Sequence, residues 1–301
     1  MTLIGIVVSL ILIVLAICIF RKKLFRKTKP NVPSRPHSGW LVGISTYELL
    51  AKADLDYERF LTWCADKGLN YTRFFSYAGW VNKDRPGFPT RQDYLDRLRG
   101  IVELADRLGI TVQLNVLLND SQSAHGNWPG EINTGTWYFR EQAPDLWAKR
   151  DQFIRDIVAT VGPQRDHFLW GLENEGKDEV HRPTRDLLAS LGVPPERMVA
   201  CRNRPLDHER YSVGFTEFHG FHEGAIDLLD TTGGAKGSHI LISDDGGRPY
   251  NTEKTWELAQ AAKRHGMGGF EHQSDMELHG HDLGWMDANE AELARRLGTL
   301  K

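Results

Sequence analysis

Short apolar runs alternate with longer amphipathic stretches along most of the chain. Eight apolar runs after residue 38 are expected to form strands, at 40–45, 71–76, 111–118, 168–172, 198–201, 212–218, 239–243 and 267–270. Five stretches between them carry apolar residues at helical spacing, at 57–67, 92–108, 145–161, 184–191 and 253–265. This alternation is typical of βα units built on a parallel sheet.

Glycines mark where several of these helices should end. Gly68, Gly109 and Gly266 each follow the last residue of a helical stretch and precede the next apolar run. Glycine readily adopts the left-handed conformation that closes a helix and turns the chain back towards the sheet. Eight strands in about 260 residues is the size of a (β/α)8 barrel, which is the fold we expect for residues 38–301.

The carboxyl end of nearly every expected strand is polar, and in such barrels the chemistry lies at these ends. The third run ends at Asn119-Asp120, the sixth at Glu217-Phe218-His219, the seventh at Ser243-Asp244 and the eighth at Glu271-His272-Gln273. The fourth run leads into Asn174 and Glu175, which place an amide beside a carboxylic acid. An amide that holds a sugar hydroxyl and an acid that protonates a glycosidic oxygen are the groups that sugar cleavage requires.

With these residues the chain resembles the large clan of retaining glycoside hydrolases built on (β/α)8 barrels, which includes cellulases, β-mannanases and β-galactosidases. The resemblance covers residues 38 to 285. It implies that Glu175 is the general acid and base and that Asn174 binds substrate. It also implies that Arg73, on the second strand, supports the nucleophile and that His219 lies near the end of the sixth strand.

The chain departs from the clan at the nucleophile, which in the clan is a glutamate that closes the seventh strand. Here that position is Asp244, whose carboxylate is shorter by one methylene. Retaining enzymes hold their two carboxyl groups about 5 to 5.5 Å apart, and inverting enzymes roughly 6.5 to 9.5 Å apart. Three alternatives stay open: Asp244 attacks, Glu271 of the neighbouring strand serves instead, or the site is inverting or inactive. Glu271 could also be a supporting carboxylate that pairs with His272 or an arginine.

Aromatic residues in the expected loops could cover the flat apolar faces of sugar rings. Trp80, Trp128 and Trp285 follow the carboxyl ends of strands two, three and eight, and we expect them to bind substrate. The segment 121–142 is long for a connection without regular structure, and such loops often form lids or binding walls.

Histidines supply a competing interpretation. His219, His222, His272, His279 and His281 lie near the ends of strands six and eight, beside several carboxylates. Imidazole and carboxylate are the ligands of zinc, manganese and iron sites, so a metal-dependent hydrolase is an alternative. Strand one ends in Gly43-Ile44-Ser45 without an imidazole, which disfavours such a site, and we expect no metal and no cofactor.

The N-terminal residues form a separate element. Residues 2–20 are almost uninterruptedly apolar, which predicts a single transmembrane helix over residues 1–20. A basic linker with three prolines follows at 21–37. A cleaved secretory signal would have basic residues before the apolar run and a cleavage site of small residues after it, and neither is present. The positive-inside rule would place the barrel in the cytoplasm, whereas most polysaccharides lie outside the cell, so the side of the membrane stays open.

Composition limits the partners. The chain has a formal net charge of -3, but the linker is strongly basic and the barrel alone carries about -10, which argues against nucleic acid as a partner. Three cysteines give no disulfide framework. The sequence therefore predicts a membrane-anchored barrel that cleaves an oligo- or polysaccharide. The alternative from another class is a barrel that binds carbohydrate without cutting it.

Overall fold

The computed structural model describes residues 39–45, 49–50, 53, 55–76, 90–116, 127–128, 132–133, 144–174, 178–201, 211–219, 237, 239–243, 252–273 and 288–300. All of them belong to one unit of the chain, which runs from His37 to Lys301. The predicted transmembrane anchor and linker lie outside the described residues. No helix within the described ranges is long and apolar enough to cross a membrane.

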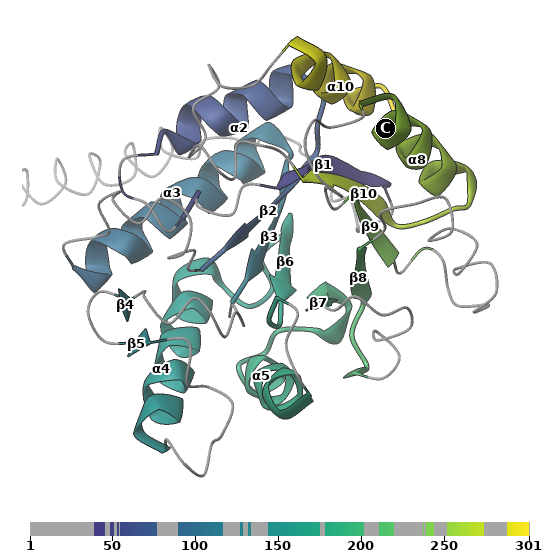
Figure 1. Ribbon diagram of the computed structural model, residues 1–301. Helices are drawn as coiled ribbons and strands as arrows, with labels where there is room; N and C mark the ends of the chain where they lie inside the picture. The colour runs from purple at the N-terminus through teal and green to yellow at the C-terminus, as the bar shows by residue number, and fades with distance from the viewer. Residues whose placement is uncertain are drawn as a thin grey trace, which may run out of the picture. The chain divides into compact units, whose positions relative to one another are not determined.

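Eight parallel strands form a closed barrel in the order β1-β10-β9-β8-β7-β6-β3-β2 (Figure 1). The strands are β1 Leu41–Ser45, β2 Tyr71–Phe75, β3 Thr111–Asn115, β6 Phe168–Gly171, β7 Met198–Cys201, β8 Phe215–His219, β9 His239–Ser243 and β10 Gly269–Gln273. The last strand closes the barrel on the first, with Leu41 paired to Gly269 and Ser45 paired to Gln273. This confirms the predicted barrel, and β6, β9 and β10 are its fourth, seventh and eighth strands.

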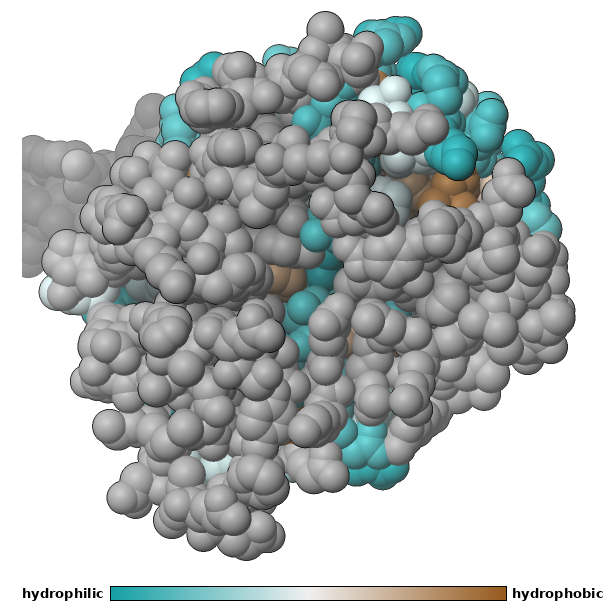
Figure 2. All heavy atoms as spheres, in the orientation of Figure 1, coloured by the Kyte–Doolittle hydropathy of each residue, from teal (hydrophilic) through white to brown (hydrophobic). Residues whose placement is uncertain are grey.

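Helices follow the strands and pack on the outside of the barrel (Figure 1). They are α2 Tyr57–Asp66, α3 Arg91–Leu108, α4 Pro144–Val161, α5 Asp178–Ser190, α8 Thr252–Arg264 and α10 Ala288–Gly298, with a short 3-10 helix at Pro195–Arg197. On the face shown in Figure 2, the described surface over α8 and α10 is mostly hydrophilic, with one small hydrophobic area. Helices α8 and α10 therefore present their polar sides to water, as amphipathic patterning requires.

Two expectations about regular structure were wrong. The segment 121–142 contains a small antiparallel hairpin, β4 Asn127–Trp128 and β5 Ile132–Asn133, where we expected an irregular loop. Helix α5 begins six residues before the expected start at Thr184 and includes Pro183. Proline lacks the amide hydrogen that an interior helix position donates, so the sequence favoured a start after it.

Helix ends follow their local chemistry. Thr90 caps α3 in a reciprocal arrangement: its hydroxyl accepts from the amide of Asp93, whose carboxylate accepts from the amide of Thr90. Gly68, Gly109 and Gly266 all have positive φ, between 70° and 81°, at the expected helix ends. The predicted glycine terminators are therefore confirmed.

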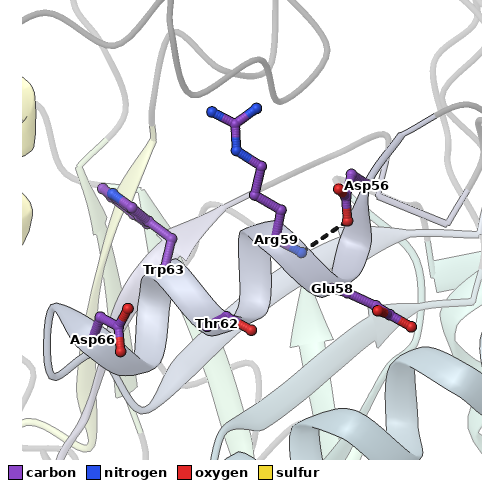
Figure 3. Close-up of a pocket in the computed structure, with 6 residues that line it drawn as sticks. All are labelled: Asp56, Glu58, Arg59, Thr62, Trp63 and Asp66. Carbon is purple, nitrogen blue, oxygen red and sulfur yellow. Dashed lines mark hydrogen bonds between the residues drawn. The ribbon is translucent and has the colours of Figure 1, made fainter.

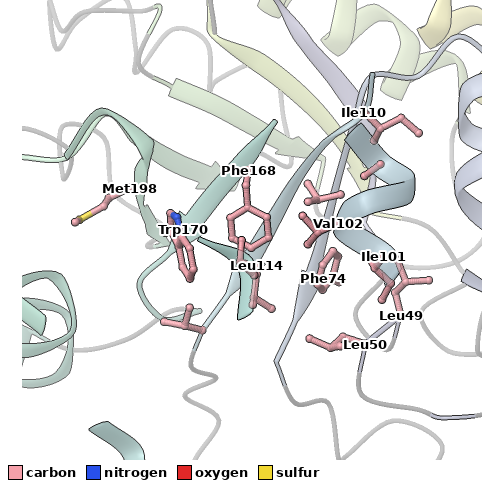
Figure 4. Packing of buried hydrophobic residues seen from close by; sticks show 14 of the residues in the cluster. Leu49, Leu50, Phe74, Ile101, Val102, Ile110, Leu114, Phe168, Trp170 and Met198 are labelled. Carbon is pink, nitrogen blue, oxygen red and sulfur yellow. The ribbon is translucent and has the colours of Figure 1, made fainter. Parts of the chain in front are cut away.

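The apolar residues fall into two separate clusters. The larger one joins the outward side chains of the strands to the helices, for example Phe74 and Leu114 packed with Ile101 and Val102 of α3 (Figure 4). The smaller cluster contains only strand residues: Leu41, Tyr71, Leu169, Val199, Cys201, Phe215 and Ile240. Because side chains alternate along a strand, this second cluster is the interior of the barrel.

Candidate active site

A charged layer lies in the barrel interior, one inward position nearer the carboxyl ends of the strands than Tyr71 and Phe215 of the apolar interior cluster. Arg73 follows Tyr71 by two residues on β2, and Glu217 follows Phe215 by two on β8, so each faces inward like its predecessor. Glu271 occupies the corresponding position on β10. These three strands alternate around the barrel, and side chains from alternate strands share one interior layer.

Arg73 is the centre of this layer and is fully buried. Its Nε donates to both carboxylate oxygens of Glu271, at 2.9 and 3.1 Å, and its Nη2 lies 2.8 Å from Oε1 of the same residue. Its Nη1 donates to Oδ1 of Asn174 at 3.2 Å and lies 3.6 Å from Oε2 of Glu217. One guanidinium therefore holds two buried carboxylates and the amide that precedes the predicted acid.

A second set of polar groups extends from Glu217 to β3. The Nε2 of Gln113 donates to Oε1 of Glu217 and, at 2.7 Å, to Oδ1 of Asn115. The Oε1 of Gln113 accepts from the hydroxyl of Tyr71 at 2.8 Å, and the thiol of Cys201 lies 3.4 Å from Oδ1 of Asn115. All of these side chains are buried, so each hydrogen bond offsets the cost of removing a polar group from water.

Gly171 on β6 leaves space for this network. A Cβ added to Gly171 on β6 would lie 2.0 Å from Oδ1 of Asn115 and 2.9 Å from Sγ of Cys201. Only glycine fits there without displacing these two residues.

Burial controls the ionisation of the layer. The pKa of the Glu271 carboxyl is raised because burial disfavours its charged form; the positive charge of Arg73 opposes this rise and the negative charge of Glu217 adds to it. The pKa of the Tyr71 hydroxyl is raised well above its ordinary value by burial and by both glutamates. Burial likewise raises the pKa of the Cys201 thiol, so Cys201 remains a neutral thiol and is no candidate nucleophile.

His272 belongs to a different environment, between the barrel wall and α10. Its Nε2 lies 3.1 Å from Oε1 of Glu290, and its Nδ1 lies 3.2 Å from the hydroxyl of Ser243. Glu271 therefore pairs with an arginine, one of its two expected partners, while His272 has its own carboxylate. Among the described residues, no group of three or more histidine, cysteine, aspartate and glutamate side chains could hold a metal ion.

Three of the predicted site residues lie together in the structure: Arg73, Asn174 and Glu271. Of His219 and Trp128 only the backbone is described, in β8 and β4. The remaining predictions lie outside the described residues, and they are Glu175, Asp244, Trp80 and Trp285. Glu173, which precedes Asn174, is fully buried.

The sequence did not assign roles to Glu217 and Gln113. A signal for both was present, because each is a polar residue at an inward position of a strand whose outward neighbours are apolar or small. In β3, Gln113 is flanked by Val112 and Leu114, and in β8, Glu217 is flanked by Thr216 and Phe218.

A pocket of about 640 Å³ lies elsewhere, on the outer side of α2 (Figure 3). Its described lining residues belong to one helix and its N-terminal cap: Asp56, Glu58, Arg59, Thr62, Trp63 and Asp66. This pocket contains none of the residues that converge inside the barrel, so we do not assign the site to it.

Comparison with solved structures gives many glycoside hydrolases with this barrel, whereas no protein-family model and no curated protein matches the sequence. The endo-1,4-β-D-mannanase of Thermotoga petrophila RKU-1 matches with a TM-score of 0.59 at 14% identity, over 87% of this chain and 100% of that chain. The endo-1,4-β-mannanase of Rhizomucor miehei matches with a TM-score of 0.58 at 12% identity, over 87% and 94%. A hyperthermophilic endo-β-1,4-glucanase matches with a TM-score of 0.53 at 10% identity, over 84% and 96%.

At these identities the likeness establishes the fold. The chain has the (β/α)8 barrel of mannanases and endoglucanases, as the sequence resemblance implied.

Proposed function

We propose that the chain hydrolyses a glycosidic bond of an oligo- or polysaccharide with retention of configuration. The observation that carries the proposal is the contact of Arg73 with both Glu271 and Asn174 inside the barrel. Through this contact the guanidinium of Arg73 holds the amide of Asn174, and Glu175 is the next residue in the sequence. The fold that the chain shares with mannanases and endoglucanases supports the same activity.

In the proposed mechanism Glu175 protonates the leaving oxygen, and the side chain of Asn174 holds a substrate hydroxyl. The second carboxylate is Asp244, which follows β9 directly in the sequence. It attacks the anomeric carbon, and water later releases the sugar with Glu175 acting as base. No cofactor takes part in this scheme.

Glu271 is the alternative second carboxylate, because it is the residue that Arg73 holds. Two observations favour a supporting role instead. Glu271 is fully buried, and both of its oxygens already accept hydrogen bonds from Arg73. A carboxylate in that position orients Arg73 better than it reaches a sugar.

The deciding experiment compares variants of the two carboxylates. Asp244→Ala should abolish hydrolysis of aryl glycosides, and azide should partly restore turnover by occupying the vacated position and giving a glycosyl azide of inverted configuration. Glu292→Gln is the control, since Glu292 is an exposed carboxylate on α10 that pairs with Arg295. If Asp244→Ala stays active while Glu271→Ala is inactive and is rescued by azide, the nucleophile is Glu271 on β10.

The acid is tested separately. Glu175→Gln should abolish turnover of natural glycosides and spare much of the first step on activated leaving groups, which need no proton. Equal losses on both kinds of substrate would remove Glu175 from this role. Sugars that raise the melting temperature while none is cut would indicate a carbohydrate-binding barrel.

A further inference from the structure

Glu217 is a buried carboxylate beside Arg73 in the barrel interior. It is fully buried, and its Oε1 accepts from the side-chain amide of Gln113. Its Oε2 lies 3.6 Å from Nη1 of Arg73. A distance of 3.6 Å is too long for a hydrogen bond, so this contact is an electrostatic attraction between buried charges.

The contact completes the support of Arg73. Glu271 engages the Nε and Nη2 edge of the guanidinium, which leaves Nη1 directed at Asn174 and Glu217. A guanidinium is planar and rigid, so attraction at a second position restricts its rotation about the first. With Glu271 alone, the plane of Arg73 could turn and move Nη1 away from Oδ1 of Asn174.

Glu217, on β8, is itself held by side chains from strands across the barrel. Gln113, which donates to it, also donates to Asn115 and accepts from the hydroxyl of Tyr71. These bonds tie Glu217 to side chains of β2 and β3. A continuous chain of polar contacts thus runs from Tyr71 through Gln113, Glu217 and Arg73 to Asn174.

We infer that Glu217 is a positioning residue: it fixes the guanidinium of Arg73 and, through Arg73, the side chain of Asn174. The inference rests on the proposed function in so far as Asn174 binds substrate there. The restraint on Arg73 and Asn174 does not depend on it, because it follows from the contacts alone.

The charge of Glu217 provides a measurable consequence. It contributes to the raised pKa of Glu271, against the lowering effect of Arg73 and the hydrogen bond from Ser45. Two neighbouring titratable groups, Tyr71 and Cys201, have pKa values raised well above their ordinary values by burial and stay uncharged. Among the described residues Glu173 is a further fully buried carboxyl, directly before Asn174, and it is present in every variant compared. Glu217→Gln keeps the shape of the side chain and removes its charge, so it should bring the pKa of Glu271 down towards its ordinary value.

The sign of the effect on stability follows from linkage. A carboxyl with a raised pKa in the folded state keeps its proton longer than in the unfolded state, so stability falls as pH rises from 4.5 to the raised value. Glu217→Gln should reduce this fall. A matched control is Glu290→Gln, which also removes a buried carboxylate but lies outside the barrel interior, beside His272.

The first test uses the full chain in mild detergent and needs no substrate. Urea midpoints are measured from pH 4 to pH 8 for the wild type, Glu217→Gln and Glu290→Gln. We expect a flatter pH dependence for Glu217→Gln alone, and destabilising shifts of Glu217→Gln and Asn174→Ala that do not add in the double variant. A wild-type slope together with additive shifts would overturn the inference.

The second test measures turnover. Glu217→Gln should lower kcat on the order of tenfold to a hundredfold with little change in KM, because Asn174 is misplaced and not lost. Glu217→Asp, which keeps the charge but withdraws it, should retain the wild-type stability slope and recover part of kcat. This variant also decides the case if Glu217→Gln fails to fold. Unchanged kcat in both variants would overturn the inference. If the wild type cuts no glycoside, the proposed function is overturned, and the first test alone decides the role of Glu217.

Discussion

Removing the buried cation should destabilise the barrel in a strongly pH-dependent manner. Arg73→Met deletes the guanidinium but keeps an unbranched apolar side chain in its place. Glu271 and Glu217 would then remain in the barrel interior, both fully buried, without the charge that lies between them. Breaking a buried ion pair by removing one partner typically costs about 3–5 kcal/mol.

Glu271 is the carboxyl that Arg73 contacts most closely, through Nε and Nη2. Arg73 lowers the pKa of Glu271, so its loss raises a pKa that is already above the ordinary 4.5. Each tenfold weakening of the Glu271 acid in the folded state costs about 1.4 kcal/mol at a pH above the raised pKa, and this cost comes on top of the one that the wild type already carries. Below pH 4.5 both states are protonated and this contribution disappears, which leaves a packing loss on the order of 1 kcal/mol.

The assay is urea unfolding of wild type and Arg73→Met from pH 4 to pH 8. Arg150→Met serves as the control, because Arg150 is similarly buried but pairs with Asp151, whose side chain is 32% exposed to solvent. We expect a loss for Arg73→Met that grows with pH and a nearly constant loss for Arg150→Met. Equal losses at pH 4 and pH 8, or a loss at pH 7 below about 1 kcal/mol, would refute the reasoning.

Two further predictions concern packing and the N-terminus. Gly171→Ala should destabilise the barrel by about 1–3 kcal/mol in urea unfolding, because the added Cβ would overlap Asn115 and Cys201, and wild-type stability would contradict this. Deletion of residues 1–36 should give a folded barrel without detergent, because β1 begins at Leu41, and it should abolish membrane association in fractionation. Aggregation of the truncated chain would contradict the predicted boundary.

The fold could be predicted from the sequence because its signals are local. Apolar runs in the strands, one-sided helices and glycine terminators each depend on residues close together in the chain. The strand predictions fall within a few residues of the observed bounds. The hairpin of β4 and β5 was not predicted because two-residue strands carry no periodicity, and the start of α5 was displaced by Pro183.

The site could be predicted only in outline, because its contacts join distant segments. The sequence placed Arg73, Asn174 and Glu271 at strand ends that should converge. It could not decide between His272 and an arginine as the partner of Glu271, since Arg73 and Glu271 are 198 residues apart and meet only through the barrel register. Strand alternation is compatible with an inward Glu217, but nothing local in the sequence identifies Arg73 as its neighbour.

The location of the charged layer is itself an argument for function. Nearer the amino ends of the strands, the same interior is filled by Leu169, Val199 and Ile240, so this barrel can pack itself with aliphatic side chains. Replacing a buried ion pair by apolar groups of similar volume is often neutral or stabilising by about 1–4 kcal/mol, so Arg73 with two glutamates is a poor choice for stability alone. Local departures from the most stable packing concentrate at functional sites. This departure lies at the end of the barrel where Arg73 reaches Asn174, which is where a barrel enzyme places its chemistry.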